Sequence, residues 1–394
     1  MSGYRPEILR SYTLKLPKII FGVNTVEEVG LEAIKFGKKC LIITDKILEE
    51  IGLVDKIIEP LKKENISYDI FDKVEAEPGP KNINSLGELV REERYKFVVG
   101  LGGGSCIDTS KAASVLATNN GKIEEYISDR KILNNGLPNI VLPTTSGSGA
   151  ENSYAIVLRY RGEKVIVRSP YCTPDIAIVD PSLTVTMPKS VTAATGIGAF
   201  CDGIDTYFCV NANALSDTVC LLAINLIWKN LRQAYYDGSN LEARYYMSLA
   251  AHHVGWVDLF GGAALIHAFA HTIGGMWRVP HGFACAVVLP YILKLTTNAM
   301  PKSRLFKLAE ALEIEPKGLS TNKVASKVIT ANKFLLKDVN APTLRDLGTK
   351  RTDLQRIIEE VLKWKKYFQR SVVVPSENEV VEIVNDMWNC KSWN

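Results

Sequence analysis

Hydrophobic residues in the first half of the chain fall into short, nearly unbroken runs that end in polar turns. Between these runs lie segments with the 3.6-residue periodicity of helices, such as residues 54–63 and 82–93. Continuous apolar strands that alternate with helices are typical of a parallel sheet covered on both faces. The pattern therefore predicts an α/β domain with strands at residues 39–45, 66–71, 97–101 and 139–143.

The second half of the chain has a different pattern. From about Thr192 it shows long stretches rich in Ala, Leu and Ile with few strand signals, for example 216–234, 242–257 and 302–312. These stretches predict an all-α domain. The pairs Asp180-Pro181 and Met187-Pro188 favour turns and predict a change of structure in this segment. We place the boundary between residues 185 and 186.

Composition and charge narrow the class of protein. The chain has 394 residues, more than one ordinary core accommodates, and a net charge of +4 without a basic block. It has no apolar run long enough to span a bilayer, and its first ten residues lack the apolar core of a signal peptide. Eight scattered cysteines without a C-x-x-C pair indicate reduced thiols. We predict a cytoplasmic protein that binds neither nucleic acid nor membranes.

A glycine-rich segment follows the third predicted strand and opens a helix. Residues 100–111 read GLGGGSCIDTSK. Glycines let the backbone approach a bulky anion, and the start of a helix presents unpaired N–H groups with a partial positive charge. A diphosphate is the ligand that suits such a loop, although the segment matches neither G-x-G-x-x-G nor a Walker loop. The alternative is a tight strand-to-helix turn without a ligand.

A second loop, PTTSGSGAE at residues 143–151, carries four hydroxyls and follows the fourth predicted strand. Ligands gather at the carboxyl ends of parallel strands, so this loop is a candidate for the same ligand, with an ordinary polar turn as the alternative. Asp45 ends the first strand. Its carboxylate would suit an adenosine ribose and would repel a 2′-phosphate, unless it is merely an exposed turn residue.

Three of the five histidines lie within fifteen positions of one another. His267 and His271 are four residues apart and share one face of a helix, and a turn at Gly274 and Gly275 is predicted to end that helix and return His281 toward His267. Imidazoles suit zinc, iron and nickel. The alternative is a chance grouping of unrelated histidines. A carboxylate ligand is expected as well, and the small, apolar segment 192–205 offers Asp202 and Asp205.

Taken together, these segments resemble the iron-containing (group III) alcohol dehydrogenase family. GGGSCIDTSKAAS is similar to the family's GGGSPIDTAKA, and PTTSGSGAE to its PTTAGTGSE. DIAIVDPSLTVTMPKSVTAATG and GGAALIHAFAHTIGG are similar to its two metal-site signatures. The resemblance implies a Rossmann-like α/β domain that binds the dinucleotide at 1–185 and an all-α domain for metal and substrate at 186–394, the dehydroquinate synthase-like fold. It also implies an active site in the cleft between them and a homodimer or higher homo-oligomer.

The resemblance also implies roles for individual residues. His271 matches a histidine near the nicotinamide that relays a proton or orients the ring. Asp45 matches an acid that favours NAD over NADP, which leaves NADP as the alternative cofactor. Lys164 matches a lysine near the cofactor ribose. The remaining cofactor residues line the diphosphate (Gly102, Gly103, Gly104 and Ser105) and the nucleotide and nicotinamide side (Thr144, Thr145 and Ser148).

The metal-site segment departs from the family pattern. Where the family has an Asp and a His in G-M-D-A-L-T-H-A-I-E, this chain has Gly198 and Asp202, while His267 and His281 match the other two ligands. We expect Asp202, His267 and His281 to hold a divalent ion, iron or zinc, in a three-ligand site with an open position, as in the related glycerol dehydrogenases. The opposite interpretation is that metal binding is lost, as described for some maleylacetate reductases.

These implications converge on an NAD(P)-dependent oxidoreductase. It would interconvert a small-molecule alcohol and its aldehyde or ketone by hydride transfer in the interdomain cleft. Two alternatives remain open at this point: a metal-independent reductase of the maleylacetate reductase type, and a nucleotide-binding relative that has lost catalysis. An enzyme of the dehydroquinate synthase type agrees less well, because the chain carries the alcohol dehydrogenase signatures.

Overall fold

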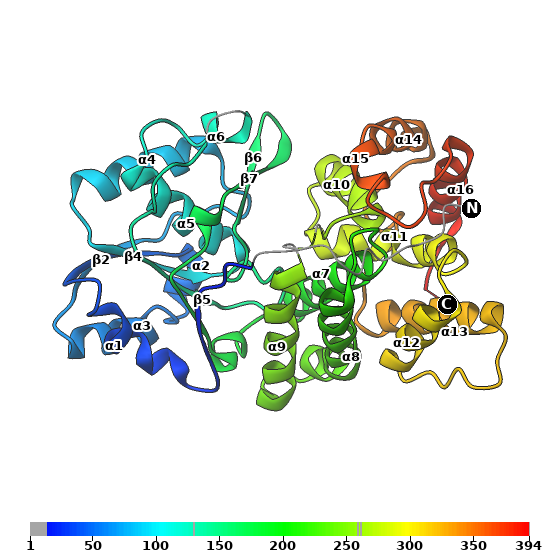
Figure 1. Ribbon diagram of the computed structural model, residues 1–394, viewed down its shortest axis with the longest axis horizontal. Helices are drawn as coiled ribbons and strands as arrows, with labels where there is room; N and C mark the ends of the chain where they lie inside the picture. Colours follow the sequence, from blue (N-terminus) through cyan, green and yellow to red (C-terminus); the bar gives the residue numbers. More distant parts are fainter. Residues whose placement is uncertain (1–13, 129–130, 258–259, 261, 394) are drawn as a thin grey trace. The chain divides into compact units, whose positions relative to one another are not determined.

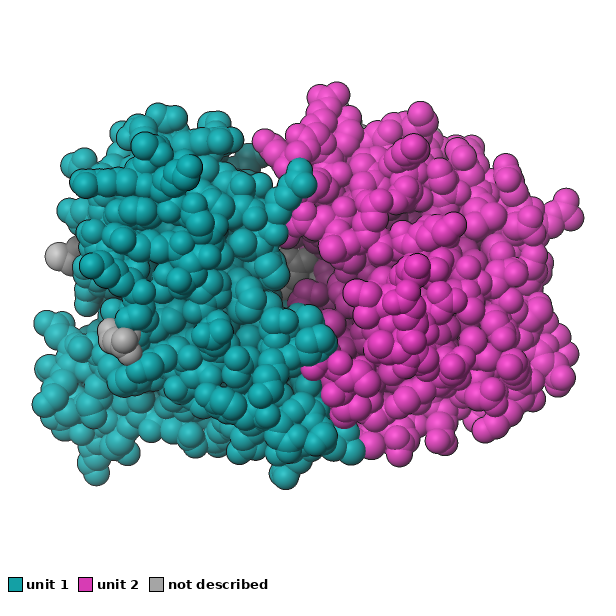
Figure 2. Space-filling model, turned by 180° about the vertical axis from the view of Figure 1, so that it is seen from behind, with its two compact units in different colours: residues 1–12, 188–394 teal, residues 13–187 magenta. Residues whose placement is uncertain are grey.

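The computed structural model describes residues 14–128, 131–257, 260 and 262–393. The chain divides into two compact units, which are coloured separately in Figure 2. Unit 2 extends to Met187, and the main segment of unit 1 begins at Pro188. The predicted boundary at residues 185 and 186 falls just before this junction, and the predicted start of the first domain, residues 1–13, lies outside the described residues.

Unit 2 is built on one six-stranded sheet with the order β1-β8-β5-β4-β2-β3, in which every neighbouring pair is parallel. The predicted α/β class is confirmed, and the four predicted strands are four of the six. Parallel pairing requires crossover connections, and helices provide them along the chain. The strands are β1 Lys18–Phe21, β2 Lys39–Ile43, β3 Ser67–Phe71, β4 Phe97–Gly102, β5 Asn139–Pro143 and β8 Ile176–Val179.

Successive residues of the central strands pack on opposite faces of the sheet. Ile42 and Val99 belong to the cluster formed with α1 and α3, whereas Leu41 and Val98 pack with α4 and α5. Figure 1 shows α1 and α3 on one side of β2 and β4, and α4 on the other. Burial on both faces explains why these strands read as unbroken apolar runs. The helices are α1 Val29–Ala33, α2 Lys46–Glu50, α3 Asp55–Lys63, α4 Pro80–Glu92, α5 Gly104–Thr118 and α6 Glu125–Ser128.

An antiparallel hairpin, which the sequence pattern did not indicate, completes unit 2. Strands β6 Ala155–Tyr160 and β7 Glu163–Arg168 pair through the turn at Arg161 and Gly162. Ile156 and Leu158 pack with the α5 residues in one buried cluster, so the hairpin covers the outer side of that helix. Short 3-10 turns lie at η1 Thr25–Glu28, η2 Pro170–Cys172 and η3 Pro181–Thr184.

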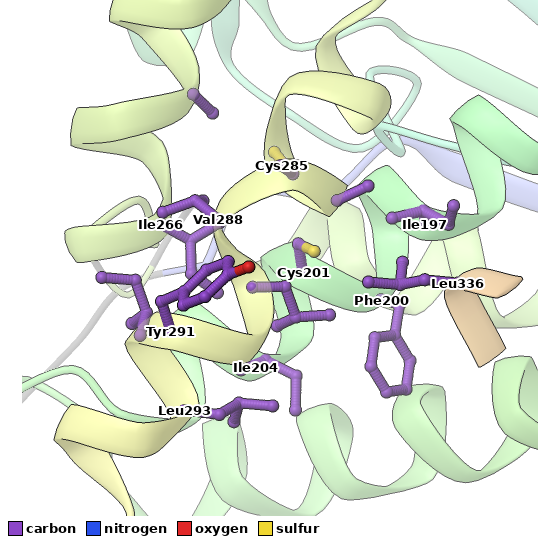
Figure 3. Close-up of a cluster of buried hydrophobic side chains, with 14 of the residues drawn as sticks. Ile197, Phe200, Cys201, Ile204, Ile266, Cys285, Val288, Tyr291, Leu293 and Leu336 are labelled. Atoms are coloured by element: carbon purple, nitrogen blue, oxygen red, sulfur yellow. The ribbon is translucent and has the colours of Figure 1, made fainter. Parts of the chain in front are cut away.

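The described part of unit 1 is helical, as the sequence predicted, with one isolated β-bridge between Cys209 and Ser371. Its core gathers apolar side chains from α7, α8, α10 and α11, and Figure 3 shows part of this cluster around Phe200 and Ile204. The helices are α7 Lys189–Tyr207, α8 Ala214–Tyr236, α9 Leu241–Val257, α10 Leu265–Trp277, α11 His281–Thr296, α12 Lys302–Ala311, α13 Thr321–Asp338, α14 Leu354–Leu362, α15 Lys365–Phe368 and α16 Glu377–Asn389, with η5 at Arg351–Asp353.

The predicted end of α10 was wrong. The helix continues through Gly274 and Gly275 to Trp277 and ends at Arg278, which has a left-handed backbone with φ 52°. A glycine inside a helix costs only about 1 kcal/mol relative to alanine, and the burial of α10 against α11 outweighs that cost. Pro280 then precedes α11, so the chain still turns back as expected, three residues later than the glycines indicated.

All eight cysteines lie in described segments, and each is a free thiol. Within the described part of the chain, none of the helices combines the length and apolar character that crossing a bilayer requires.

Candidate active site

Three helices of unit 1 bring the predicted metal ligands toward one another. His267 on α10 is buried, with 5% of its surface exposed, and its Nε2 lies 2.8 Å from Oδ1 of Asp202 on α7. The ring of His281, the first residue of α11, lies 5.1 Å from the ring of His267. Positions 198 and 202 share a face of α7, so the carboxylate of Asp202 reaches His267 although the residues at both ligand positions of this helix differ from the family pattern.

Asp205, one turn further along α7, fixes the orientation of His267. Its Oδ2 lies 2.8 Å from Nδ1 of His267 and also accepts a hydrogen bond of 2.6 Å from the amide of Ala264. The amides of Ile266 and His267 donate to the same carboxylate at 3.2 and 3.3 Å. Asp205 therefore caps the start of α10 from another helix and leaves Nε2 of His267 directed toward Asp202.

The electrostatics at His267 favour a positive charge. Burial alone would lower the pKa of this imidazole, but the hydrogen bonds to Asp202 and Asp205 act in the opposite direction and raise its pKa well above the ordinary value. Two carboxylates that converge on one buried imidazole thus create a site where a cation is stabilised. A divalent metal ion, which brings its own charge, fits this environment.

The third histidine lies beside the other two. The ring of His271 stacks on that of His281, with centroids 5.5 Å apart and an interplanar angle of 19°. The rings of Trp364, the residue before α15, and of Tyr367, within α15, have their centroids 5.2 and 5.6 Å from that of His271. The aromatic rings limit the orientations that the His271 imidazole can adopt.

Glycines allow α7 and α11 to approach closely beside this cluster. A Cβ on Gly282 would lie 1.7 Å from the carbonyl oxygen of Ala194, and a Cβ on Gly198 would meet Cα of Gly282 at 3.5 Å. The two helices are therefore in backbone contact at the place where the family's aspartate would project. This contact positions His281, at the start of α11, next to His267.

The cluster contains one more side chain, Cys285, which the sequence analysis did not single out. Ligand atoms of His267, His281 and Cys285 all lie within 4.8 Å of one another, and Sγ of Cys285 is 3.6 Å from Nε2 of His281. Cys285 was read from the sequence only as one of eight reduced thiols. The available signal was its spacing, because a residue four positions after His281 on a helix shares its face.

In unit 2, the glycine loop and the hydroxyl loop lie side by side. β4 and β5 pair in register so that Gly102 lies opposite Pro143, and the amide of Thr144 donates to the carbonyl of Gly102 at 3.0 Å. A Cβ on Gly103 would lie 3.4 Å from Thr145, and one on Gly104 would lie 3.0 Å from Oγ of Ser148. The predicted diphosphate residues and hydroxyl residues therefore form one cradle at the carboxyl ends of two strands.

Gly102 occupies a position that only glycine suits. Its φ is 148°, and an added Cβ would lie 2.6 Å from Sγ and 2.7 Å from Cβ of Cys106. Cys106 in turn lies beside the acid that ends the first strand, with Sγ 3.6 Å from Oδ2 of Asp45. The same carboxylate caps α2 by accepting from the amide of Leu48 at 3.1 Å. Asp45 therefore lies close to the glycine loop in the fold.

The two remaining predicted cofactor residues both contact the segment before α4. Oγ of Ser105 donates to the carbonyl of Ala76 at 2.6 Å, and Nζ of Lys164 lies 3.1 Å from Oε1 of Glu77. Ser105 is the second residue of α5, whereas Lys164 belongs to the hairpin. Ser105 and Lys164 thus contact adjacent residues, Ala76 and Glu77. The carboxylate of Glu77 is shared between Lys164 and Arg159.

Comparison with known proteins gives a consistent result for both units. The family model "Iron-containing alcohol dehydrogenase" matches residues 17–181, and the model "Fe-containing alcohol dehydrogenase family, C-terminal" matches residues 192–388. The chain is 34% identical over 355 residues to long-chain-alcohol dehydrogenase 1 of Geobacillus thermodenitrificans, covering 89% of this chain and 90% of that protein. It is 30% identical over 352 residues to an NAD-dependent methanol dehydrogenase of Bacillus methanolicus, covering 88% and 92%. A solved 1,3-propanediol oxidoreductase superposes with a TM-score of 0.90 at 34% identity, covering 96% of this chain and all of that one.

Proposed function

The chain belongs to the iron-containing alcohol dehydrogenase family, and on that premise we propose that it transfers hydride between NAD and a small alcohol or carbonyl compound with the help of a divalent metal ion. The observation that carries this proposal is the position of His267 between the other two residues: its Nε2 lies 2.8 Å from Oδ1 of Asp202, and its ring lies 5.1 Å from that of His281. A carboxylate beside two imidazoles is a ligand set for a catalytic metal with an open position.

The cradle of unit 2 supports a dinucleotide. Gly103 and Gly104 carry no Cβ where one would fill the space beside Thr145 and Ser148, and the start of α5 presents backbone N–H groups there. Asp45 places a negative charge near this loop, which disfavours the additional phosphate of NADP. When bound, nicotinamide supplies the hydride acceptor or donor. The similarity to an NAD-dependent methanol dehydrogenase agrees with this choice.

The histidine cluster of unit 1 supports a metal ion and a substrate oxygen. Asp205 holds the Nδ1 side of His267, so Nε2, now 2.8 Å from Oδ1 of Asp202, would bind the ion in place of that contact, together with Asp202 and His281. A divalent ion, when bound, polarises the alcohol or carbonyl oxygen and makes loss or gain of the hydroxyl proton easier. His271 stacks on His281, and its imidazole is the group we assign to exchange that proton with solvent.

The substrate class follows from the relatives only in outline. Their names include a long-chain alcohol, 1,3-propanediol and methanol, which share a hydroxyl group and differ in length. We propose a small-molecule alcohol or its carbonyl product. The predicted homodimer or higher homo-oligomer and the predicted cytoplasmic location stay predictions.

The decisive experiment is a cofactor and substrate screen of the purified protein. Absorbance of NADH and NADPH would be followed with a panel of aldehydes, and reduction of NAD with primary alcohols and diols of increasing length. We expect turnover with NADH that is lost on chelation and restored by added Zn²⁺ or Fe²⁺. In Asp202→Asn, whose side chain is 22% exposed in the wild type, we expect metal loss without loss of folding. Absence of turnover with every pair would overturn the proposal.

One observation favours a second candidate function, a metal-independent reductase. Both nitrogens of His267 already lie 2.8 Å from carboxylate oxygens, which is a complete hydrogen-bonded arrangement without an ion. In such an enzyme, His271 or His281, rather than His267, would donate a hydrogen bond to the carbonyl oxygen of the substrate. Unchanged turnover after exhaustive chelation, together with less than stoichiometric metal in the active protein, would establish this alternative.

A further inference from the structure

The fourth side chain of the histidine cluster is a thiol. Cys285 is fully buried on α11, one helical turn after His281, and both face the same side of that helix. The ligand atoms of His267, His281 and Cys285 lie within 4.8 Å of one another. Among the residues that the structure describes, this is the group whose ligand atoms meet that mutual distance.

The separation between the thiol and His281 is the one expected of two ligands of the same ion. Zn–S bonds of about 2.3 Å and Zn–N bonds of about 2.0 Å, at a tetrahedral angle, place the sulfur and nitrogen roughly 3.5 Å apart. The observed distance between Sγ of Cys285 and Nε2 of His281 is 3.6 Å. The spacing therefore fits co-ligands without movement of α11.

The surroundings of Cys285 are arranged as an outer shell around a sulfur ligand. The thiol of Cys201, on α7, makes a side-chain hydrogen bond with Cys285, and Figure 3 shows the two cysteines within the same cluster. Donors to a coordinating sulfur hold it in place and moderate its charge. On the opposite side, Asp202 and His281 are partly exposed, so the cluster is closed at the sulfur and accessible at the carboxylate.

We propose that Cys285 is a metal ligand in this protein together with His267 and His281, that Asp202, 2.8 Å from His267, supplies the fourth ligand, and that the site prefers Zn²⁺ over Fe²⁺. The inference rests on the proposed metal-dependent function. Gly198 contributes no ligand from α7, and Cys285 adds one from α11 instead. A thiolate is a soft ligand. A ligand set that includes it therefore favours zinc more than a set of carboxylate and imidazoles alone. Coordination replaces the S–H bond by a sulfur–metal bond, and the proton leaves to solvent.

The test uses the full-length protein, stripped of metal and reloaded with Zn²⁺ or Co²⁺. X-ray absorption of the zinc form should show one sulfur neighbour at about 2.3 Å, and the cobalt form should show the intense near-ultraviolet charge-transfer band of a thiolate–cobalt bond. Cys285→Ser should remove both signals and lower Zn²⁺ affinity more than about 100-fold, because it removes a direct ligand rather than an outer partner. The zinc-to-iron affinity ratio should fall in the same variant.

Cys220→Ser is the matched control, because Cys220 is also fully buried in a helix of the same unit but is not in the metal group. It should keep both spectroscopic signals. Metal bound through nitrogen and oxygen only, with Cys285→Ser and Cys220→Ser behaving alike, would overturn the sulfur ligand and leave the metal-dependent function standing. Failure of the wild type to bind either ion would overturn both. If Cys285→Ser does not fold, the wild-type absorption spectrum still decides.

Discussion

Asp205 on α7 both caps the helix that carries His267 and holds the imidazole of that residue. One carboxylate, 2% exposed, accepts hydrogen bonds from the backbone at the start of α10 and lies 2.8 Å from Nδ1 of His267. The orientation of the candidate metal ligand is thus coupled to the formation of its helix. Asp205 therefore contributes both to stability and to metal binding, and different substitutions of this residue should affect the two properties to different extents.

Asp205→Ala should destabilise unit 1, because it leaves buried amide groups at the start of α10 without an acceptor. Each unsatisfied group costs about 1–3 kcal/mol, and the amides of Ala264, Ile266 and His267 all lose their acceptor. The free energy of unfolding should therefore fall by about 3 kcal/mol or more. Asp205→Asn keeps an acceptor oxygen, so its loss should be smaller, whereas its metal affinity should fall about 10- to 100-fold. Urea unfolding and metal titration would measure the two effects. Equal stability of the two variants would contradict the capping role.

His271→Gln should slow turnover while leaving the metal in place. The proposed role of His271 is proton exchange, which contributes roughly 10²- to 10⁴-fold in rate, and it is not in the group of candidate ligands. The measurements are kcat with the preferred alcohol and metal content by elemental analysis. If metal is lost together with activity, His271 is a ligand and the assignment is wrong.

Gly103→Ala should weaken NADH binding without affecting folding. Gly103 has φ −73°, which alanine adopts without strain, but its Cβ would enter the cradle beside Thr145. Crowding of this kind costs about 1–3 kcal/mol, equivalent to a rise of about 5- to 150-fold in the NADH dissociation constant. Fluorescence titration with NADH would measure it.

Gly79→Ala is the control for that experiment. Gly79 precedes α4 with a similar extended backbone, and a Cβ there would meet nothing within 4 Å. NADH affinity should therefore remain at the wild-type value. A comparable loss in both variants would mean that the effect comes from the helix start in general and not from the cradle.

Asp45→Ser should shift cofactor preference toward NADPH. Serine retains the ability to cap α2 at Leu48, so folding is preserved, while the charge that opposes a 2′-phosphate is removed. We expect the ratio of kcat/KM for NADPH to that for NADH to rise roughly tenfold, which corresponds to about 1.4 kcal/mol. An unchanged ratio in a variant of unchanged melting temperature would exclude Asp45 as the selecting residue.

Much of the fold could be predicted from the local pattern of apolar and polar residues. The elements that were predicted wrongly or missed have a common cause, which is their dependence on tertiary packing. β2, β4 and β5 are buried on both faces, so their apolar runs were visible without knowledge of their partners. The β6–β7 hairpin was not predicted, because its stability depends on packing against α5 rather than on its own alternation. Gly274 and Gly275 were read as a helix end, because the burial that sustains α10 through them is not a local property.

From the residues alone we could predict the two kinds of domain, the glycine loop between a strand and a helix, and the return of His281 toward His267 across a turn. These depend on periodicity and on the spacing of neighbouring residues, which the chain displays directly. Two further relationships are visible in the folded chain alone: which acid faces which nitrogen of His267, and the position of Cys285 beside the histidines. Those relationships arise from the close approach of α7, α10 and α11, and the distance between side chains on different helices is fixed by packing rather than by order along the chain.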